Sequence, residues 1–382
     1  MDNRNEQLAH NLIVNSISLK ENDNLLVELT GKDGLELANE IIRQAKEINA
    51  RPILKVTEYE KLREFLIKAT DEEIIEYGKR DYETMKKMQA YIGISSPRSD
   101  KSLEGVPQEK IESYNKNYTA LVHLEQRVKH TKWCILRYPN EYFAKKSNMT
   151  LDEFRDFYYK VCNVDYNKMK NAMDSLKDLM NKTDKVHIVA PGTDITFRIK
   201  GIPAEKYYGT FNIPDGEVAT CPVRDSINGY ITYNTKTKYN DIIFEDIKFE
   251  FENGKIVNAS AREHTKQLND ILDTDEGARY IGEFAFGLNP YINNTMCDTL
   301  FDEKINGSFH LTPGTALEES DNGNRSAIHW DIVKIMRKEY GGGKIYFDDV
   351  LIMKDGNFIL EDLKKLNAEI WNSIENTINS SD

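Results

Sequence analysis

The chain of 382 residues lacks several features that identify common protein classes. No apolar run approaches the roughly 20 residues of a transmembrane helix, so we expect no membrane span. The four cysteines are scattered without a C-x-x-C pair, so we expect neither a zinc knuckle nor a disulfide framework, and a reducing cytoplasm is the simplest setting. The G-x-S-x-G nucleophile elbow is also missing, which argues against serine-based catalysis.

Basic residues are in deficit as well. Lysine and arginine total 51 against 63 aspartates and glutamates, which gives a formal net charge of −12 and a pI near 5.3. Nucleic acid and anionic membrane surfaces would repel such a chain at long range. We therefore expect a small molecule or a peptide as the partner, and neither nucleic acid nor membrane.

The first half of the chain carries the pattern of a βαβ unit. The run "NLLVELTGKDGLELANEIIRQAKEINARPILKVTE" consists of an apolar strand, a turn, a helix with apolar residues at helical spacing, and a second apolar strand. Such units predict a parallel sheet. "YIGI" and "TKWCILRYP" predict further strands between long helical patterns. We expect residues 1–184 to form an N-terminal parallel-sheet α/β domain.

The sequence pattern changes after about Asp184. Short alternating segments such as "HIVAPGTDITFRIKG" and "IIFEDIKFEFENGKIVNASA" follow one another, separated by Gly, Asn and Asp. The chain is long enough for two cores, because single cores stop growing at about 250–300 residues. We expect residues 185–382 to form a second, β-rich mixed α/β domain, and the whole chain to belong to the α/β class.

Two histidines each end an alternating run, His310 in "GSFHL" and His329 in "RSAIHWD". Side chains alternate between faces along a strand, so His329 and Asp331 would project from one face while Trp330 points away. Two imidazoles and a carboxylate suit zinc, iron(II), cobalt or manganese. We expect His310, His329 and Asp331 to form a metal triad.

Two glutamates extend this set. Glu217 in "NIPDGEVAT" and Glu283 in "RYIGEFAFGL" both follow a glycine at the entrance to an apolar strand. A carboxylate that enters a buried run must be paired or metal-bound, whereas an exposed loop position needs neither. Three carboxylates and two imidazoles can hold two divalent ions with a bridging carboxylate and water, which is a hydrolase centre.

Over nearly its whole length the chain resembles the M29 metallo-aminopeptidases, the thermophilic aminopeptidase family. In the N-terminal half the resemblance is carried by "TKWCILRYP", "MTLDEFRDFYYKVCNVDY" and "PGTDITFRIKG". In the C-terminal half it is carried by "NIPDGEVATCPVRDSINGYITYN", "IGEFAFGLNP", "TLFDEK", "SFHL" and "NGNRSAIHWD". These segments occur in family order, and each ligand-bearing motif is present.

The resemblance implies a C-terminal catalytic domain that removes N-terminal residues from short peptides in the cytoplasm, in a homodimer, with two divalent ions of zinc, cobalt, manganese or magnesium. Its motifs carry the metal ligands over to Glu217, Glu283, His310, His329 and Asp331. One of the two glutamates is the candidate proton shuttle. Asp302 and Glu303 in "TLFDEK" are candidates for holding the substrate's α-amino group through charge-assisted hydrogen bonds.

The sequence departs from the family pattern in two places. The family's metal-site tyrosine, expected a few residues after His310, is missing from the loop "LTPGTALEESDNGNRSAI", where the corresponding position falls near Leu317. Glu318 or Glu319 is a possible substitute ligand in that loop. In addition, "DEK" stands where the family usually has Asp-Glu-Asn, so that Lys304 occupies the third position.

Two other functions stay open at this point. His310, His329 and Asp331 alone satisfy the pattern of a mononuclear iron(II) oxygenase, and ring-cleaving dihydroxypyridine dioxygenases resemble the same fold. Glu217 and Glu283 favour hydrolysis instead, because a mononuclear centre needs neither glutamate. A catalytically weakened, metal-binding homologue is the third possibility.

Overall fold

The computed structural model describes residues 3–99, 101–239 and 242–371, and it divides into two compact units. The first unit contains residues 1–164 and 209–213, and the second contains residues 165–208 and 214–382. Helix α8 (Tyr166–Lys182) belongs to the second unit in this division, although it lies within residues 1–184, the range expected for the N-terminal domain. No helix among the described residues is both long and apolar enough to cross a membrane.

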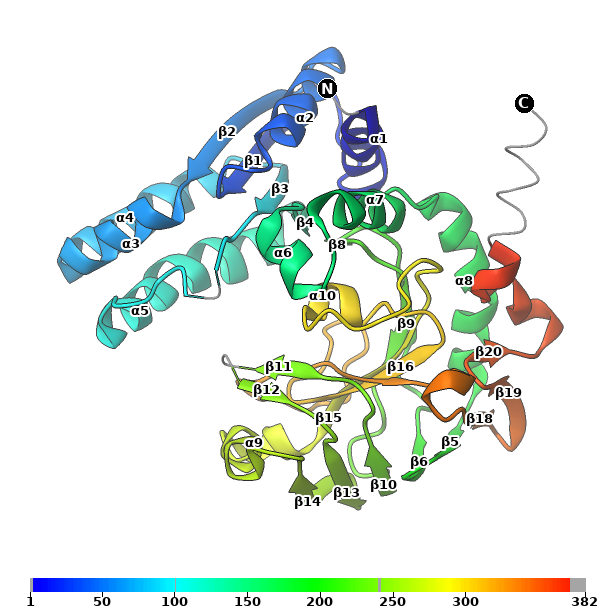
Figure 1. Cartoon of the computed structure of the whole chain (residues 1–382). Helices are drawn as coiled ribbons and strands as arrows, with labels where there is room; N and C mark the ends of the chain where they lie inside the picture. Colours follow the sequence, from blue (N-terminus) through cyan, green and yellow to red (C-terminus); the bar gives the residue numbers. More distant parts are fainter. Residues whose placement is uncertain (1–2, 100, 240–241, 372–382) are drawn as a thin grey trace, which may run out of the picture. The chain divides into compact units, whose positions relative to one another are not determined.

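The first unit is built on a parallel sheet of five strands in the order β2-β1-β3-β4-β8 (Figure 1). These strands are β1 (Asn24–Thr30), β2 (Arg51–Thr57), β3 (Ala90–Ser95), β4 (Lys132–Arg137) and β8 (Asn212–Ile213). The helices are α1 (Asn3–Asn11), η1 (Leu12–Ser16), α2 (Leu35–Glu47), α3 (Tyr59–Lys68), α4 (Asp71–Met85), α5 (Gln108–Tyr114), η2 (Asn115–Val128), α6 (Glu141–Lys146) and α7 (Leu151–Cys162).

The predicted βαβ unit is present as β1, α2 and β2. The two strands pair in parallel over their full lengths, from Asn24 opposite Arg51 to Thr30 opposite Thr57. The start of α7 follows from a capping box: Thr150 accepts a hydrogen bond from the backbone of Glu153, whose side chain accepts one from the Thr150 backbone. The fold-class prediction of a parallel-sheet α/β region at the N-terminus is therefore confirmed.

The second unit contains mainly antiparallel sheets. An eight-stranded sheet runs in the order β14 (Lys255–Ser260), β13 (Lys248–Glu252), β10 (Asn228–Thr232), β6 (Thr193–Arg198), β5 (Lys185–Ala190), β18 (Lys344–Phe347), β19 (Val350–Lys354) and β20 (Asn357–Phe358). A five-stranded sheet, which we name the site sheet, runs in the order β17 (Ile332–Ile335), β16 (Ser308–Pro313), β15 (Ile281–Gly287), β9 (Glu217–Thr220) and β7 (Glu205–Tyr207).

The remaining elements of the second unit are short, apart from α8. Strands β11 (Thr237–Tyr239) and β12 (Ile242–Phe244) form a small separate sheet. The other helices are α9 (Thr265–Leu272), η3 (Glu276–Arg279), α10 (Thr299–Asp302), η4 (Lys338–Tyr340) and η5 (Glu361–Leu366). Helix α8 packs against β7, β9 and η5, so it covers the β9 end of the site sheet (Figure 1).

The two large sheets of the second unit share an aromatic core. Phe284 on β15 lies 5.0 Å, between ring centroids, from Phe197 on β6, and Phe286 lies 6.1 Å from Phe347 on β18. Because side chains alternate along a strand, the residues next to these phenylalanines in β15 must face the other way. Glu283 and Ala285 therefore project from the opposite face of the site sheet, where the functional residues collect.

Candidate metal centre

Three central strands of the site sheet each contribute one polar side chain to the face that points away from the aromatic core. They are Glu217 at the start of β9, Glu283 in β15 and His310 in β16. In the strand register, His310 lies opposite Ala285, which in turn lies opposite Ala219. These small neighbours leave room above the sheet for the longer side chains to approach one another.

The glycine before each glutamate is required by the backbone. Gly216 has φ +133°, and a Cβ there would lie 3.1 Å from the Asn289 backbone nitrogen. A Cβ on Gly282 would lie 2.2 Å from the Thr315 carbonyl oxygen, so only glycine lets this loop close over β15. The register of β15 shifts between Ile281 and Glu283, a bulge that re-aims Glu283. Both glutamates are buried, which excludes the exposed-loop interpretation.

His329 and Asp331 lie just before β17, and not inside a strand as the alternation of "AIHWD" suggested. His329 forms an isolated bridge with Gly314, and Trp330 turns to the other side. Trp330 is 2% exposed, donates a hydrogen bond to Thr237 at 3.1 Å and packs its ring on Phe244. The predicted separation of the tryptophan from its two neighbours therefore holds.

The five predicted side chains converge as two overlapping groups. Glu217, Glu283 and His310 offer ligand atoms that all lie within 4.8 Å of one another, and so do Glu283, His329 and Asp331. His310 Nε2 lies 3.3 Å from Glu283 Oε1, while His329 Nε2 lies 3.2 Å from Glu283 Oε2. Glu283 thus presents one oxygen to each group.

The carboxylates make the centre strongly anionic, and this negative charge raises the pKa of both imidazoles. Burial lowers the pKa of His310, but Glu283 and Glu217 raise it by more, to about 9. Burial likewise lowers the pKa of His329, and Asp331 and Glu283 raise it well above its usual value. An environment that holds protons on both imidazoles has an excess of negative charge, which favours the binding of cations.

The donor atoms fit divalent metal ions in three further respects. Glu217 Oε2 is buried and has no hydrogen-bond partner among the described residues, a costly state that a cation would relieve. His329 Nδ1 lies 3.0 Å from the Thr315 carbonyl oxygen and donates there, so a metal ion would take the place of the proton on Nε2. Thr312 donates a 2.6 Å hydrogen bond to Asp331, which orients that carboxylate.

Comparison with known proteins identifies the family. The family model described as thermophilic metalloprotease (M29) matches residues 1–358. This chain belongs to that family. Membership makes it a metalloprotease-family protein, and it implies a divalent metal ion. The resemblance noted in the sequence is therefore confirmed.

Two relatives, both named as aminopeptidases, agree with the M29 assignment. Aminopeptidase PepS of Streptococcus thermophilus is 25% identical over 382 residues, which cover 86% of this chain and 91% of PepS. Aminopeptidase 2 of Geobacillus stearothermophilus is 24% identical over 264 residues, which cover 59% of this chain and 62% of that relative.

Two solved structures share the fold. AmpT from Thermus thermophilus matches with a TM-score of 0.79 and 21% identity, over 94% of this chain and 99% of AmpT. The 2,5-dihydroxypyridine dioxygenase from Pseudomonas putida KT2440 matches less well, with a TM-score of 0.58 and 14% identity, over 94% of this chain and 98% of that chain. At these identities the likeness shows the fold alone.

Lys304, the residue that departs from the M29 pattern, lies at the centre and was not identified as a site residue from the sequence. Its side chain is fully buried, and Nζ lies 2.8 Å from Glu217 Oε1 and 2.6 Å from Glu303 Oε1. Asp215 Oδ1 is 3.8 Å away. Burial lowers the pKa of Lys304, but these three carboxylates raise it well above the usual value, so the side chain is an ammonium ion.

The other predicted residues of "TLFDEK" lie in different environments. Asp302 accepts a 2.6 Å hydrogen bond from the Met296 backbone, so this carboxylate is tied to its own loop. Glu303 is largely buried beside Lys304, and Asp331, Glu217 and His310 all influence its pKa. Burial raises the pKa of Glu303 well above its usual value, although Lys304 opposes the rise. Glu303 is therefore close to the centre without belonging to either ligand group.

The loop that lacks the family tyrosine contributes no substitute ligand to the two groups. Glu318 and Glu319 are both exposed and belong to neither group, and Leu317 is half-buried, with its backbone nitrogen bonded to the Gly282 carbonyl oxygen. A phenol does approach from another strand. Tyr207 on β7 lies directly opposite Glu217 on β9, so both side chains project from the same face.

Tyr207 is also within electrostatic reach of the centre. Burial raises the pKa of Tyr207 above its usual value, and the charges of Glu319, Glu283 and Glu217 raise it further. The sequence contained little signal for this residue, because it ends a three-residue strand with no alternating pattern. Only the pairing of β7 with β9 brings it beside Glu217.

Proposed function

We propose that this chain is an aminopeptidase whose centre would hold two divalent metal ions, with Glu283 as a ligand in both sites. The observation that carries the proposal is the pair of ligand groups that share Glu283, with one of its oxygens facing each imidazole. Glu217 and His310 would complete one site, and His329 and Asp331 the other. The M29 relatives PepS and aminopeptidase 2, which are named as aminopeptidases, support the same activity.

The chain's own residues would divide the work. When bound, the two cations would polarise the scissile carbonyl and lower the pKa of a water molecule between them. Glu217 or Glu283 would carry the proton from that water to the leaving amine. Among the five ligand side chains, His329 is the most open, with 34% exposure against 9% or less for the others, so substrate would approach from its side.

An aminopeptidase must also hold the free α-amino group of its substrate. We assign this task to Glu303, because its carboxylate is close to the centre and belongs to neither ligand group. Lys304 would act as a positioning residue: its ammonium group holds Glu217 Oε1 and leaves the buried Oε2 for the metal. Asp302 would stabilise the loop that carries both residues, through its bond to Met296.

The ring-cleaving dioxygenase is the second candidate, and the geometry favours it less. A mononuclear iron(II) site needs two imidazoles and one carboxylate, yet both groups here include Glu283, and one adds Glu217. Two buried carboxylates beyond the mononuclear set would repel each other without a second cation. Short peptides are therefore the proposed substrates. The homodimer and the cytoplasmic location stay predictions from the family resemblance.

Metal removal tests the proposal. Dialysis against a chelator should abolish release of the aniline from a panel of aminoacyl-anilides, because the water would lose its activation. Re-addition of about two equivalents of zinc, cobalt or manganese per chain should restore activity. Dihydroxypyridine with iron(II) is the counter-test. Full peptidase activity in chelated protein, or turnover of the pyridine without that of the anilides, would contradict the assignment.

Tyr207 offers a second test within the same site. We propose that its phenol replaces the missing loop tyrosine and donates to the oxygen that becomes negative during attack. Tyr207→Phe should lower kcat by about ten- to a hundredfold with little change in KM, as expected for a lost oxyanion donor. The control is Tyr208→Phe, whose ring contacts Lys170 on the surface. An unchanged kcat in Tyr207→Phe would remove the phenol from the mechanism.

A further inference from the structure

A pocket in the first unit lies far along the sequence from the residues of the metal centre. It has a volume of about 430 Å³ and is lined by the segments that follow β1, β2 and β3. In the parallel sheet, β2 and β3 lie on opposite sides of β1. The order in which the chain adds strands to the sheet therefore changes direction at β1. Open α/β sheets bind ligands at such a switch point, at the carboxyl ends of the strands.

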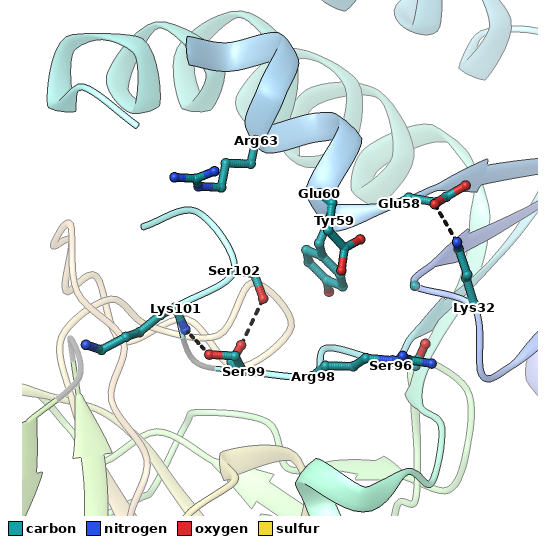
Figure 2. A pocket seen from close by; sticks show the side chains of 11 residues that line it. Lys32, Glu58, Tyr59, Glu60, Arg63, Ser96, Arg98, Ser99, Lys101 and Ser102 are labelled. Carbon is teal, nitrogen blue, oxygen red and sulfur yellow. Dashed lines mark hydrogen bonds and ion pairs between the residues drawn. The ribbon is translucent and has the colours of Figure 1, made fainter. Parts of the chain in front are cut away.

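The backbone at this switch point is closely packed. Gly31, directly after β1, has φ +100°, and a Cβ there would lie 2.2 Å from the Ser96 hydroxyl oxygen after β3. A glycine is therefore needed for the ends of the two strands to meet. The loop that follows Ser96 then supplies Arg98, Ser99, Lys101 and Ser102 to the pocket wall, opposite Tyr59 and Arg63 from helix α3 (Figure 2).

The charges that line the pocket contrast with those of the whole chain. The chain has a net charge of −12, whereas the described residues that line the pocket include four cationic and two acidic side chains. The cations are Lys32, Arg63, Arg98 and Lys101, and the acids are Glu58 and Glu60. Lys32 pairs with Glu58 at 2.7 Å, which cancels one charge of each sign. Lys101 pairs with Glu104 at 3.3 Å and Arg98 with Asp33, so Arg63 is the lining cation that has no carboxylate partner among the described residues.

The two arginines differ in how they are held. Arg98 pairs with Asp33 at 2.8 Å, which holds its guanidinium beside the pocket floor. Arg63 donates through Nε to the Glu104 carbonyl oxygen, and among the described residues its guanidinium pairs with no carboxylate. A guanidinium that is anchored by a carbonyl and lacks a counter-charge has free donors for an anion. On the facing loop, the Ser102 hydroxyl donates to the Ser99 carbonyl oxygen, whereas the Ser99 hydroxyl accepts from the Lys101 backbone and keeps its own proton to donate (Figure 2).

We propose that this pocket binds a phosphate group, either free phosphate or the phosphate of a small monoester such as a nucleoside monophosphate. Arginine forks match the tetrahedral oxygens of phosphate, and the Ser99 hydroxyl would donate a further hydrogen bond to it. The volume lies within the range of about 300–1,000 Å³ that is typical of small-molecule sites. The site is independent of peptide hydrolysis, and it adds a second binding function to the chain.

Calorimetric titration of the full-length, metal-loaded protein with AMP and with inorganic phosphate tests the proposal. At least one of them should bind with a Kd below about 1 mM, and the tighter of the two identifies the source of the phosphate group. Arg63→Gln and Arg98→Gln should each weaken binding by at least about fivefold, because each removes charge-assisted hydrogen bonds. Arg80→Gln, which changes an exposed arginine on α4, should have no effect.

Phosphate can also bind to metal ions, so the metal centre needs its own control. Binding at the pocket should keep its native Kd in Glu283→Gln and weaken at least about fivefold in Arg63→Gln. The proposal is overturned if neither ligand binds, if binding survives in both arginine variants, or if it disappears only in Glu283→Gln. None of these outcomes bears on peptidase activity.

Discussion

Glu283→Gln should lower kcat/KM for aminoacyl-anilides by about a thousandfold or more, which corresponds to about 4 kcal/mol of transition-state free energy. Glutamine keeps the shape of the side chain but removes its charge. Because Glu283 belongs to both ligand groups, its replacement weakens both proposed metal sites at once. A substitution of His310 or Asp331 would affect one group only.

Metal content separates this effect from simple misfolding. Glu283→Gln should bind fewer ions per chain than the native protein, by elemental analysis after gel filtration, while its circular dichroism stays unchanged. Glu276→Gln is a matched control, because that side chain is 88% exposed and lies on the short helix η3 just before β15. Near-native rates and full metal content in Glu283→Gln would remove the bridging role and with it the proposed hydrolase centre.

Much of this centre could be predicted from the sequence, for a local physical reason. A carboxylate after a glycine at the start of an apolar strand has few low-energy explanations, so Glu217 and Glu283 were recognisable without coordinates. The alternation in "AIHWD" separated Trp330 from its neighbours, and "DGLELANEII" between two apolar runs predicted the βαβ unit. Each of these patterns lies within a segment short enough for local geometry to decide the outcome.

The features that escaped prediction all depend on contacts between distant segments. Lys304 and Glu217 are 87 residues apart in the chain, and a single lysine after two acids normally lies in solvent. Its departure from the family pattern was the only sequence signal. Tyr207 lies beside Glu217 because β7 pairs with β9. The bulge at Gly282 depends on the loop that closes over β15. Helix α8 shows no pattern that reveals which unit it packs against.

Lys304→Met should have the largest effect on stability. Removing the buried ammonium group leaves Glu217, Glu303 and Asp215 without their shared counter-charge, at a cost of about 3–5 kcal/mol in the free energy of unfolding. Methionine fills similar space, so the loss would be mainly electrostatic. Denaturant unfolding in the presence of a chelator measures it. Lys266→Met is the control, because that side chain is 83% exposed and pairs with Asp270 on the surface of α9.

Divalent ions should change this result in a characteristic way. Without Lys304, the carboxylates around Glu217 carry more uncompensated negative charge, so a bound cation relieves more repulsion than it does in the native protein. Excess zinc or manganese should therefore raise the unfolding free energy of Lys304→Met by more than that of the native chain, since an ion that binds only the folded state stabilises it. Peptide hydrolysis should stay slow even with added metal, because Lys304 no longer holds Glu217 through its Oε1 atom. Equal stabilisation of the two proteins, together with native stability in chelator, would mean that Lys304 does not neutralise the centre.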